Sequence, residues 1–197
     1  MLNTGLTAPA TRKLMHHRQV ECIGYRRDDG LWDIEGHLVD TKSYDLLDLD
    51  RGPSPAGQPL HEMWLRLTVD DDLNVVGVEA RTVWGPYNMC GDITPNFQVL
   101  KGLTIKAGWT QKTRELLGGT KGCTHLLELL GPMATTAFQT VYSLREKRHR
   151  EQGKAKRPGL LDSCHAWASD SPVIAKRFPE FYTGPKKATT GQSENGD

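Results

Sequence analysis

The clearest pattern along the chain is an alternation of apolar and polar residues in its first half. An alternation with a period of two is typical of strands that bury one face. Turn-forming sequences at residues 26–30, which end in Asp-Gly, and at the Asp-rich residues 70–74 separate two pairs of these stretches and predict two hairpins. The predicted strands cover residues 20–25, 31–41, 60–69 and 75–84.

The second half of the chain has a helical pattern instead. A Gly-rich turn at residues 118–122 leads into a long segment whose apolar residues recur every three or four positions, and two shorter helices are expected over residues 94–102 and 103–117. Side chains at this spacing share one face of a helix, so we expect the long helix to bury one stripe. The stripe consists of Leu126, Leu129, Leu130, Met133, Ala137, Phe138 and Val141.

Strands followed by helices predict an α+β fold. We expect an antiparallel sheet of about four strands, from residues 19–84, with the helices of residues 94–145 packed on one face. A chain of 197 residues can form one sizeable core, so a single domain is expected over residues 19–183. Residues 1–18 have no periodicity and predict a flexible leader, and the polar residues 184–197 predict a disordered tail.

Composition excludes several classes of partner. Lys and Arg number 25 against 24 Asp and Glu, and a net charge of +1 gives no general attraction to nucleic acid or to anionic lipid. No apolar run reaches the ~20 residues that a membrane span requires, and the first residues do not have the pattern of a signal peptide. We therefore expect a cytoplasmic protein that binds a small molecule, without a nucleic-acid or membrane partner; its oligomeric state stays open.

The second predicted strand has a row of titratable side chains on its polar face. Asp33, Glu35 and His37 point away from the face that carries Trp32 and Ile34. This row is either a solvated sheet face or the floor of a site in which Asp33 and His37 transfer protons. Each reading is compatible with the alternation alone.

The start of the long helix is a second candidate for chemistry. Cys123 and His125 fall in its first turn, where free backbone N–H groups and the helix dipole stabilise a thiolate or a bound anion. Glu128 follows His125 by three residues and lies on the same helix face. Cys123 is thus either a functional thiol or a small buried hydrophobic residue. His61, which begins the apolar face of the third strand, is either a hydrogen-bonded edge histidine or a ligand, and the pair Cys164 and His165 receives no role.

Three segments resemble a bacterial family of unknown function: RRDDGLWDIEGHL at residues 26–38, PLHEMWLRL at 59–67 and GCTHLLELL at 122–130. A more distant likeness concerns residues 63–144, where a hairpin with an acidic tip, a loop cysteine, a short helix and a cysteine opening a long helix follow one another. This order is similar to that of the U-type iron-sulfur scaffold proteins. The likeness implies that Cys90 matches the loop cysteine and Cys123 the helix cysteine.

The sequence departs from that scaffold family at two positions. Leu60-His61-Glu62 stands where the family has its first cysteine, and the histidine beside the helix cysteine is replaced by His125, two residues after Cys123. Two thiolates and two imidazoles suit one zinc ion better than a cluster. The ligand set expected from the likeness is His61, Cys90, Cys123 and His125, placed where the end of the sheet, the Cys90 loop and the start of the long helix meet.

Three functions from different classes remain open. The first is a lyase or hydrolase acting on a small organic substrate, for instance an aromatic or phenolic one, with Asp33, His37, Cys123 and Glu128 as catalytic residues and one zinc ion as the cofactor. The second is a carrier of metal or sulfur related to the iron-sulfur scaffolds. The third is a protein-interaction module without catalysis.

Overall fold

The computed structural model describes residues 6–8, 10–47, 50–151 and 158–185. It divides into two compact units, Met1–Glu146 and Lys147–Asp197. Most of the predicted tail, residues 186–197, and part of the predicted leader, residues 1–5 and 9, lie outside the described residues. Within the described part, no helix combines the length and the apolarity needed to cross a membrane.

The first unit contains a four-stranded antiparallel sheet, as the alternation predicts. Its strands are β1 (His16–Arg26), β2 (Trp32–Lys42), β3 (Pro59–Val69) and β4 (Val75–Trp84), and they pair in the order β1-β2-β3-β4. Each strand is joined to the next by a hairpin or loop, so the sheet is a simple meander. β1 begins at His16 and therefore includes residues that the sequence pattern assigned to the leader.

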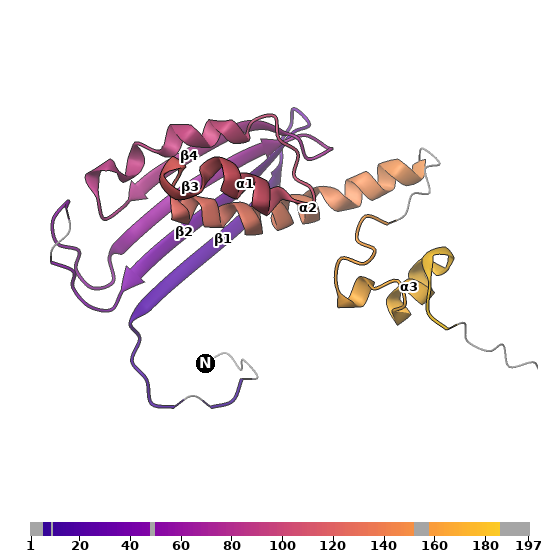
Figure 1. Ribbon diagram of the computed structural model, residues 1–197, viewed down its shortest axis with the longest axis horizontal. Coiled ribbons are helices and arrows are strands. Elements are labelled where there is room, and N and C mark those ends of the chain that lie inside the picture. The colour runs from indigo at the N-terminus through magenta and orange to yellow at the C-terminus, as the bar shows by residue number, and fades with distance from the viewer. Residues whose placement is uncertain (1–5, 9, 48–49, 152–157, 186–197) are drawn as a thin grey trace, which may run out of the picture. The chain divides into compact units, whose positions relative to one another are not determined.

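Helices cover one face of this sheet (Figure 1). The order along the chain is η1 (Asn88–Gly91), η2 (Thr94–Leu100), α1 (Trp109–Leu117), η3 (Gly119–Lys121) and α2 (Thr124–Glu151), where η marks a 3₁₀ helix. The architecture is the expected α+β class. α1 begins six residues later than predicted, because residues 103–105 bond to the turn between β3 and β4: Ile105 donates its N–H to the carbonyl of Leu73 at 2.9 Å.

The core lies between β2 and β3 on one side and α2 on the other. Strand residues such as Ile34, Leu38 and Leu67 are completely buried there. The predicted stripe of α2 is buried at every position except Phe138, which is half-buried and has its ring 5.4 Å from that of Tyr142. Phe138 packs against the core but is only partly buried, because it lies at the margin of the face that α2 presents to the sheet.

The second unit is built from short elements. They are η4 (His165–Trp167), α3 (Pro172–Arg177) and η5 (Pro179–Phe181). The Ser171 hydroxyl accepts the N–H of Ile174 at 3.3 Å and caps α3, and the rings of Trp167 and Phe178 lie 5.6 Å apart. Cys164 and His165 are exposed in this unit.

Candidate metal centre

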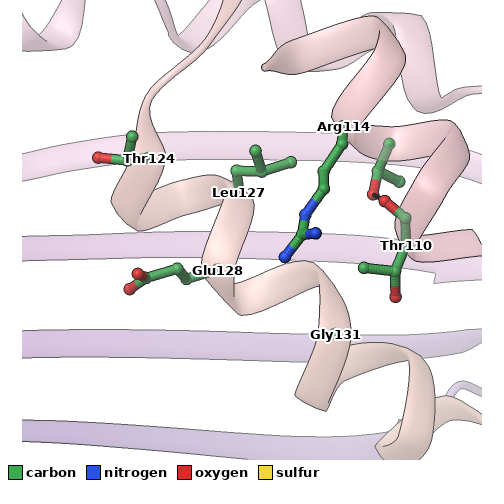
Figure 2. Close-up of a pocket in the computed structure, with 7 residues that line it drawn as sticks. Thr110, Arg114, Thr124, Leu127, Glu128 and Gly131 are labelled. Carbon is green, nitrogen blue, oxygen red and sulfur yellow. Dashed lines mark hydrogen bonds between the residues drawn. The ribbon is translucent and has the colours of Figure 1, made fainter. Parts of the chain in front are cut away.

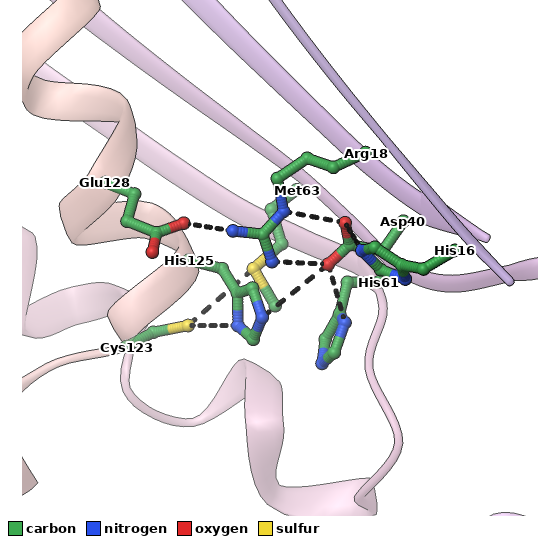
Figure 3. A network of polar contacts seen from close by, with 8 residues as sticks. All are labelled: His16, Arg18, Asp40, His61, Met63, Cys123, His125 and Glu128. Atoms are coloured by element: carbon green, nitrogen blue, oxygen red, sulfur yellow. Dashed lines mark hydrogen bonds and ion pairs between the residues drawn. The ribbon is translucent and has the colours of Figure 1, made fainter. Parts of the chain in front are cut away.

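Three elements of the first unit bring a carboxylate and two imidazoles together at one end of the sheet (Figure 3). Asp40 is near the end of β2, His61 is its direct partner on β3, and His125 is in the first turn of α2. One oxygen of Asp40 lies 3.1 Å from Nδ1 of His61 and 3.7 Å from Nε2 of His125. Antiparallel pairing therefore places Asp40 beside His61, and the packing of α2 on the sheet brings His125 next to them.

Asp40 is the buried charge of this cluster, since its side chain is 1% exposed. On the neighbouring strand Arg18 is paired with it in register, and Arg18 donates from Nε to one carboxylate oxygen at 2.8 Å and from Nη2 to the other at 2.7 Å. Burial alone would raise the pKa of Asp40, but these hydrogen bonds and the charge of Arg18 outweigh it and hold the pKa below its usual value. Asp40 is therefore ionised at neutral pH.

The two imidazoles are neutral at the same pH. Their rings stack with centroids 3.8 Å apart. Burial, followed by repulsion from His125, lowers the pKa of His61 to about 4, and burial, followed by the charge of Arg18, lowers the pKa of His125. A neutral imidazole keeps a free lone pair, which is the form that binds a metal.

These three side chains could hold a metal ion, because one ligand atom from each lies within 4.8 Å of the others. Zinc bonds to histidine and carboxylate ligands are ~2.0–2.2 Å long, so ligand atoms around one ion lie about 3–4 Å apart. The two separations measured from Asp40 fall in that range. In the part of the chain that the structure describes, no other group of three His, Cys, Asp or Glu side chains is close enough.

Glu128 connects this cluster to a cleft between α1 and α2. Its carboxylate forms an ion pair with Nη1 of Arg18, so Arg18 bridges Asp40 and Glu128. The cleft has a volume of about 370 Å³, and Arg114 reaches across it from α1 toward α2 (Figure 2). Its lining consists of Thr110, Thr113, Arg114, Thr124, Leu127, Glu128 and Gly131. Glu128 thus belongs to both the cleft and the charged cluster.

The structure brings together three of the four residues expected to bind zinc. His61 and His125 are adjacent, and the sulfur of Cys123 lies 3.9 Å from Nδ1 of His125 and 3.7 Å from the sulfur of Met63. Cys90 is in η1, packed against Gly85 at the end of β4, and is not among the side chains that meet at Asp40. Three parts of the chain were expected to meet. The end of the sheet and the start of α2 lie together, whereas the Cys90 loop does not join them.

The four residues expected to be catalytic lie on two different faces. Cys123 and Glu128 are on the helix-covered side, whereas Asp33 and His37 are on the open face of β2, where Asp33 accepts the Thr68 hydroxyl at 2.7 Å. The ring of His37 stacks on that of Trp64 at 3.8 Å, and its Nε2 lies 3.4 Å from a carboxylate oxygen of Glu62. The sheet therefore separates Asp33 and His37 from the start of α2.

Sequence reasoning missed Asp40, Arg18 and His16, whose Nε2 lies 3.3 Å from Asp40. One signal was present in the sequence. Asp40 is an even number of residues from the apolar Ile34 and Leu38, so it lies on the same face of the strand. A carboxylate on a buried face requires charged or hydrogen-bonding partners. The partners themselves were hidden because Arg18 was assigned to the leader.

Comparison with known proteins gives a family but no activity. No curated protein and no solved structure matches the chain, so the likeness to iron-sulfur scaffolds is not confirmed. The model of a family described as "Protein of unknown function (DUF2889)" matches residues 16–139, which include β1 to β4 and every side chain of the cluster around Asp40. This match covers more than half of the 197 residues, and the chain therefore belongs to the DUF2889 family.

Proposed function

We propose that this protein is a metal-dependent enzyme of the lyase or hydrolase type that acts on a small organic substrate. Asp40, His61 and His125 would hold one divalent ion, with zinc as the first candidate. The observation that carries the proposal is a buried carboxylate placed beside two imidazoles whose pKa values are lowered, so that all three side chains are in their metal-binding forms at neutral pH.

The donor set fits a catalytic ion better than a structural one. Two histidines and one carboxylate are three protein ligands, and a catalytic zinc site keeps a fourth position for water or substrate. A bound zinc ion would polarise a substrate oxygen or lower the pKa of a water molecule. Iron(II) is the alternative that the same donor set accommodates.

The cleft beside the cluster supplies a place for the substrate. Its volume of about 370 Å³ is at the lower end of the range for small-molecule sites, which agrees with a single-ring aromatic or phenolic compound. Leu127 offers an apolar contact, while the half-exposed carboxylate of Glu128 is in position to accept or return a proton. The aromatic character of the substrate is part of the proposal.

Metal analysis of the purified full-length protein tests the proposal. We expect about one zinc or iron per chain, and roughly 10- to 1,000-fold weaker zinc binding in His61→Gln and His125→Gln, since each variant removes one ligand. His37→Gln is the matched control, because it removes an imidazole from the opposite face of the same sheet. Failure of the wild-type protein to bind zinc, iron, cobalt or manganese would contradict the metal centre.

A second candidate, a thiol hydrolase, is favoured by the line from Cys123 through His125 to Asp40. Sulfur and Nδ1 are 3.9 Å apart at one end of His125, and Nε2 and the Asp40 oxygen are 3.7 Å apart at the other. A cysteine nucleophile oriented in this way reacts rapidly with alkylating agents. Peptide mapping after iodoacetamide treatment decides: the thiol mechanism requires Cys123 to react faster than the more exposed Cys164, and slower reaction excludes it.

A further inference from the structure

Arg18 is hydrogen-bonded to Asp40, the carboxylate ligand of the proposed metal centre. Its Nε and Nη2 groups hold the two oxygens of Asp40 in a two-pronged arrangement, and its Nη1 is paired with Glu128. Figure 3 shows the guanidinium between the two carboxylates, with the rings of His61 and His125 below it in this view. Asp40 is thus already neutralised by a cation of the chain itself.

A metal ion and Arg18 would compete for this oxygen of Asp40. The oxygen that faces both imidazoles is the one that accepts Nη2 of Arg18 at 2.7 Å. A metal bond of ~2.0–2.2 Å to the same oxygen would place two cationic groups close together in a poorly solvated site. Ion binding therefore favours a guanidinium that has turned away from this oxygen.

Glu128 determines where the guanidinium would remain after that movement. Its carboxylate is 57% exposed, lines the cleft and holds Nη1, so Arg18 would stay anchored at the cleft while its Nε and Nη2 edge became free. Two parallel N–H groups on a planar guanidinium fit a carboxylate in bidentate fashion. The freed edge, which now faces Asp40, would be available to a carboxylate.

The net charge of the cluster also favours an anionic substrate. Arg18, Asp40 and Glu128 carry one positive and two negative charges. A divalent ion would change this net negative cluster into a net positive one. A substrate with one negative group would restore neutrality.

We propose that Arg18 is a displaceable residue that holds Asp40 in the metal-free protein and binds the carboxylate of an anionic substrate once the metal ion has replaced it. This inference rests on the proposed metal centre and assigns its substrate class as small organic carboxylates. Arg18 is a competitor for the ion in one state and a substrate-binding residue in the other.

The zinc affinities of the full-length wild type and Arg18→Gln test the competition. We expect the variant to bind zinc at least ~10-fold more tightly, because the ion no longer has to displace a cation. Arg81→Gln is the matched control: it removes the same charge from β4, where Arg81 is paired with Trp64, and its affinity should remain within about two-fold of wild type. Equal or weaker zinc binding by Arg18→Gln, with an unchanged melting temperature, overturns the inference.

Benzoate serves as the carboxylate probe. Calorimetry should detect benzoate binding to zinc-loaded wild type but not to the metal-free protein, in which Asp40 occupies Arg18. Zinc-loaded Arg18→Gln and Arg18→Lys should both bind it at least ~10-fold more weakly, because neither side chain presents two parallel N–H groups. Metal-independent binding, absence of binding, or binding that both variants retain overturns the substrate assignment.

The failure of this inference can be distinguished from the failure of the proposed function. If neither wild type nor Arg18→Gln binds a divalent ion, both the metal centre and the role of Arg18 are wrong. If both proteins bind zinc equally tightly, the metal centre stands and only the role of Arg18 is lost. If the wild type binds no divalent ion and only the variant binds zinc, the metal centre of the wild-type protein is contradicted, and Arg18 is a permanent partner of Asp40 that is not displaced.

Discussion

Gly36 of β2 lies directly beneath Met133 of α2: a β-carbon on residue 36 would be 2.6 Å from the Met133 sulfur. This approach lets α2 descend onto the centre of the sheet. We predict that Gly36→Ala lowers the free energy of unfolding by about 1–3 kcal/mol, because the added methyl group overfills the contact. Urea denaturation measures the loss. Gly131→Ala on α2 is the control, since its β-carbon meets nothing within 4 Å and the change should be neutral or stabilising by up to ~1 kcal/mol.

A double variant tests the cause of that loss. Met133→Ala alone should cost about 2–5 kcal/mol as a deletion in the core. Combined with Gly36→Ala, the total should be smaller than the two separate losses together, because the shortened side chain makes room for the methyl group. Strictly additive losses would show that the two residues do not press on each other.

Phe138 and Leu129 should differ in their contribution to stability although both are on α2. Leu129 is completely buried, so Leu129→Ala should cost about 2–5 kcal/mol. Phe138 is only half-buried, and Phe138→Ala should therefore cost less than the ~3–5 kcal/mol typical of a buried phenylalanine. Thermal or chemical denaturation ranks the two variants. A larger loss for Phe138→Ala would mean that α2 presents a different face to the sheet.

The metal-free protein should lose stability in mild acid. His61 has a pKa of about 4 in the folded chain and an ordinary value of 6.5, so between these pH values the unfolded state binds more protons. Stability is therefore highest above pH ~6.5 and decreases as the pH falls toward 4. The gap corresponds to about 3 kcal/mol for His61 alone, and His125 acts in the same direction because its pKa is also lowered. Denaturation at a series of pH values, with chelator present, should show a flatter profile for His61→Gln than for wild type.

Cys123→Ser tests whether the sulfur belongs to the proposed metal centre. The sulfur is next to His125 but outside the group formed by Asp40, His61 and His125, so the variant should keep its zinc affinity within about three-fold if those three residues bind the ion. Its melting temperature should change little, because serine has nearly the same size. A loss of zinc at unchanged stability would make Cys123 a fourth ligand.

The fold could be predicted from the sequence to a large extent because its two central strands, β2 and β3, each bury one face. Alternation at a period of two places Ile34, Leu38 and Leu67 on one side whatever the details of the loops, and the 3.6-residue period does the same for Leu126 and Leu129. The partial burial of Phe138 could not be predicted, because periodicity does not give the width of the buried stripe.

The candidate site was predictable only in part. His61 and His125 were identified because histidines at the start of a strand and of a helix are visible as exceptions to the pattern. Arg18 and Asp40 were not, because their importance depends on the register that pairs them across β1 and β2. That register is a property of the folded sheet. Because the first four residues of β1 are all polar, the pattern gave no reason to begin the strand at His16.

The position of Arg18 on the first strand suggests how an ion could reach a buried carboxylate. Within the described sheet β1 is an edge strand, paired on one side only, whereas β2 and β3 are each paired on both sides. The ends of edge strands open locally at far lower free energy than the centre of a fold. Brief separation of residues 16–18 from β2 would remove the guanidinium while Asp40 and His61 stayed in register on their central strands. Admission of the ion would then follow the fraying of one strand end, with no requirement for the rest of the sheet to unfold.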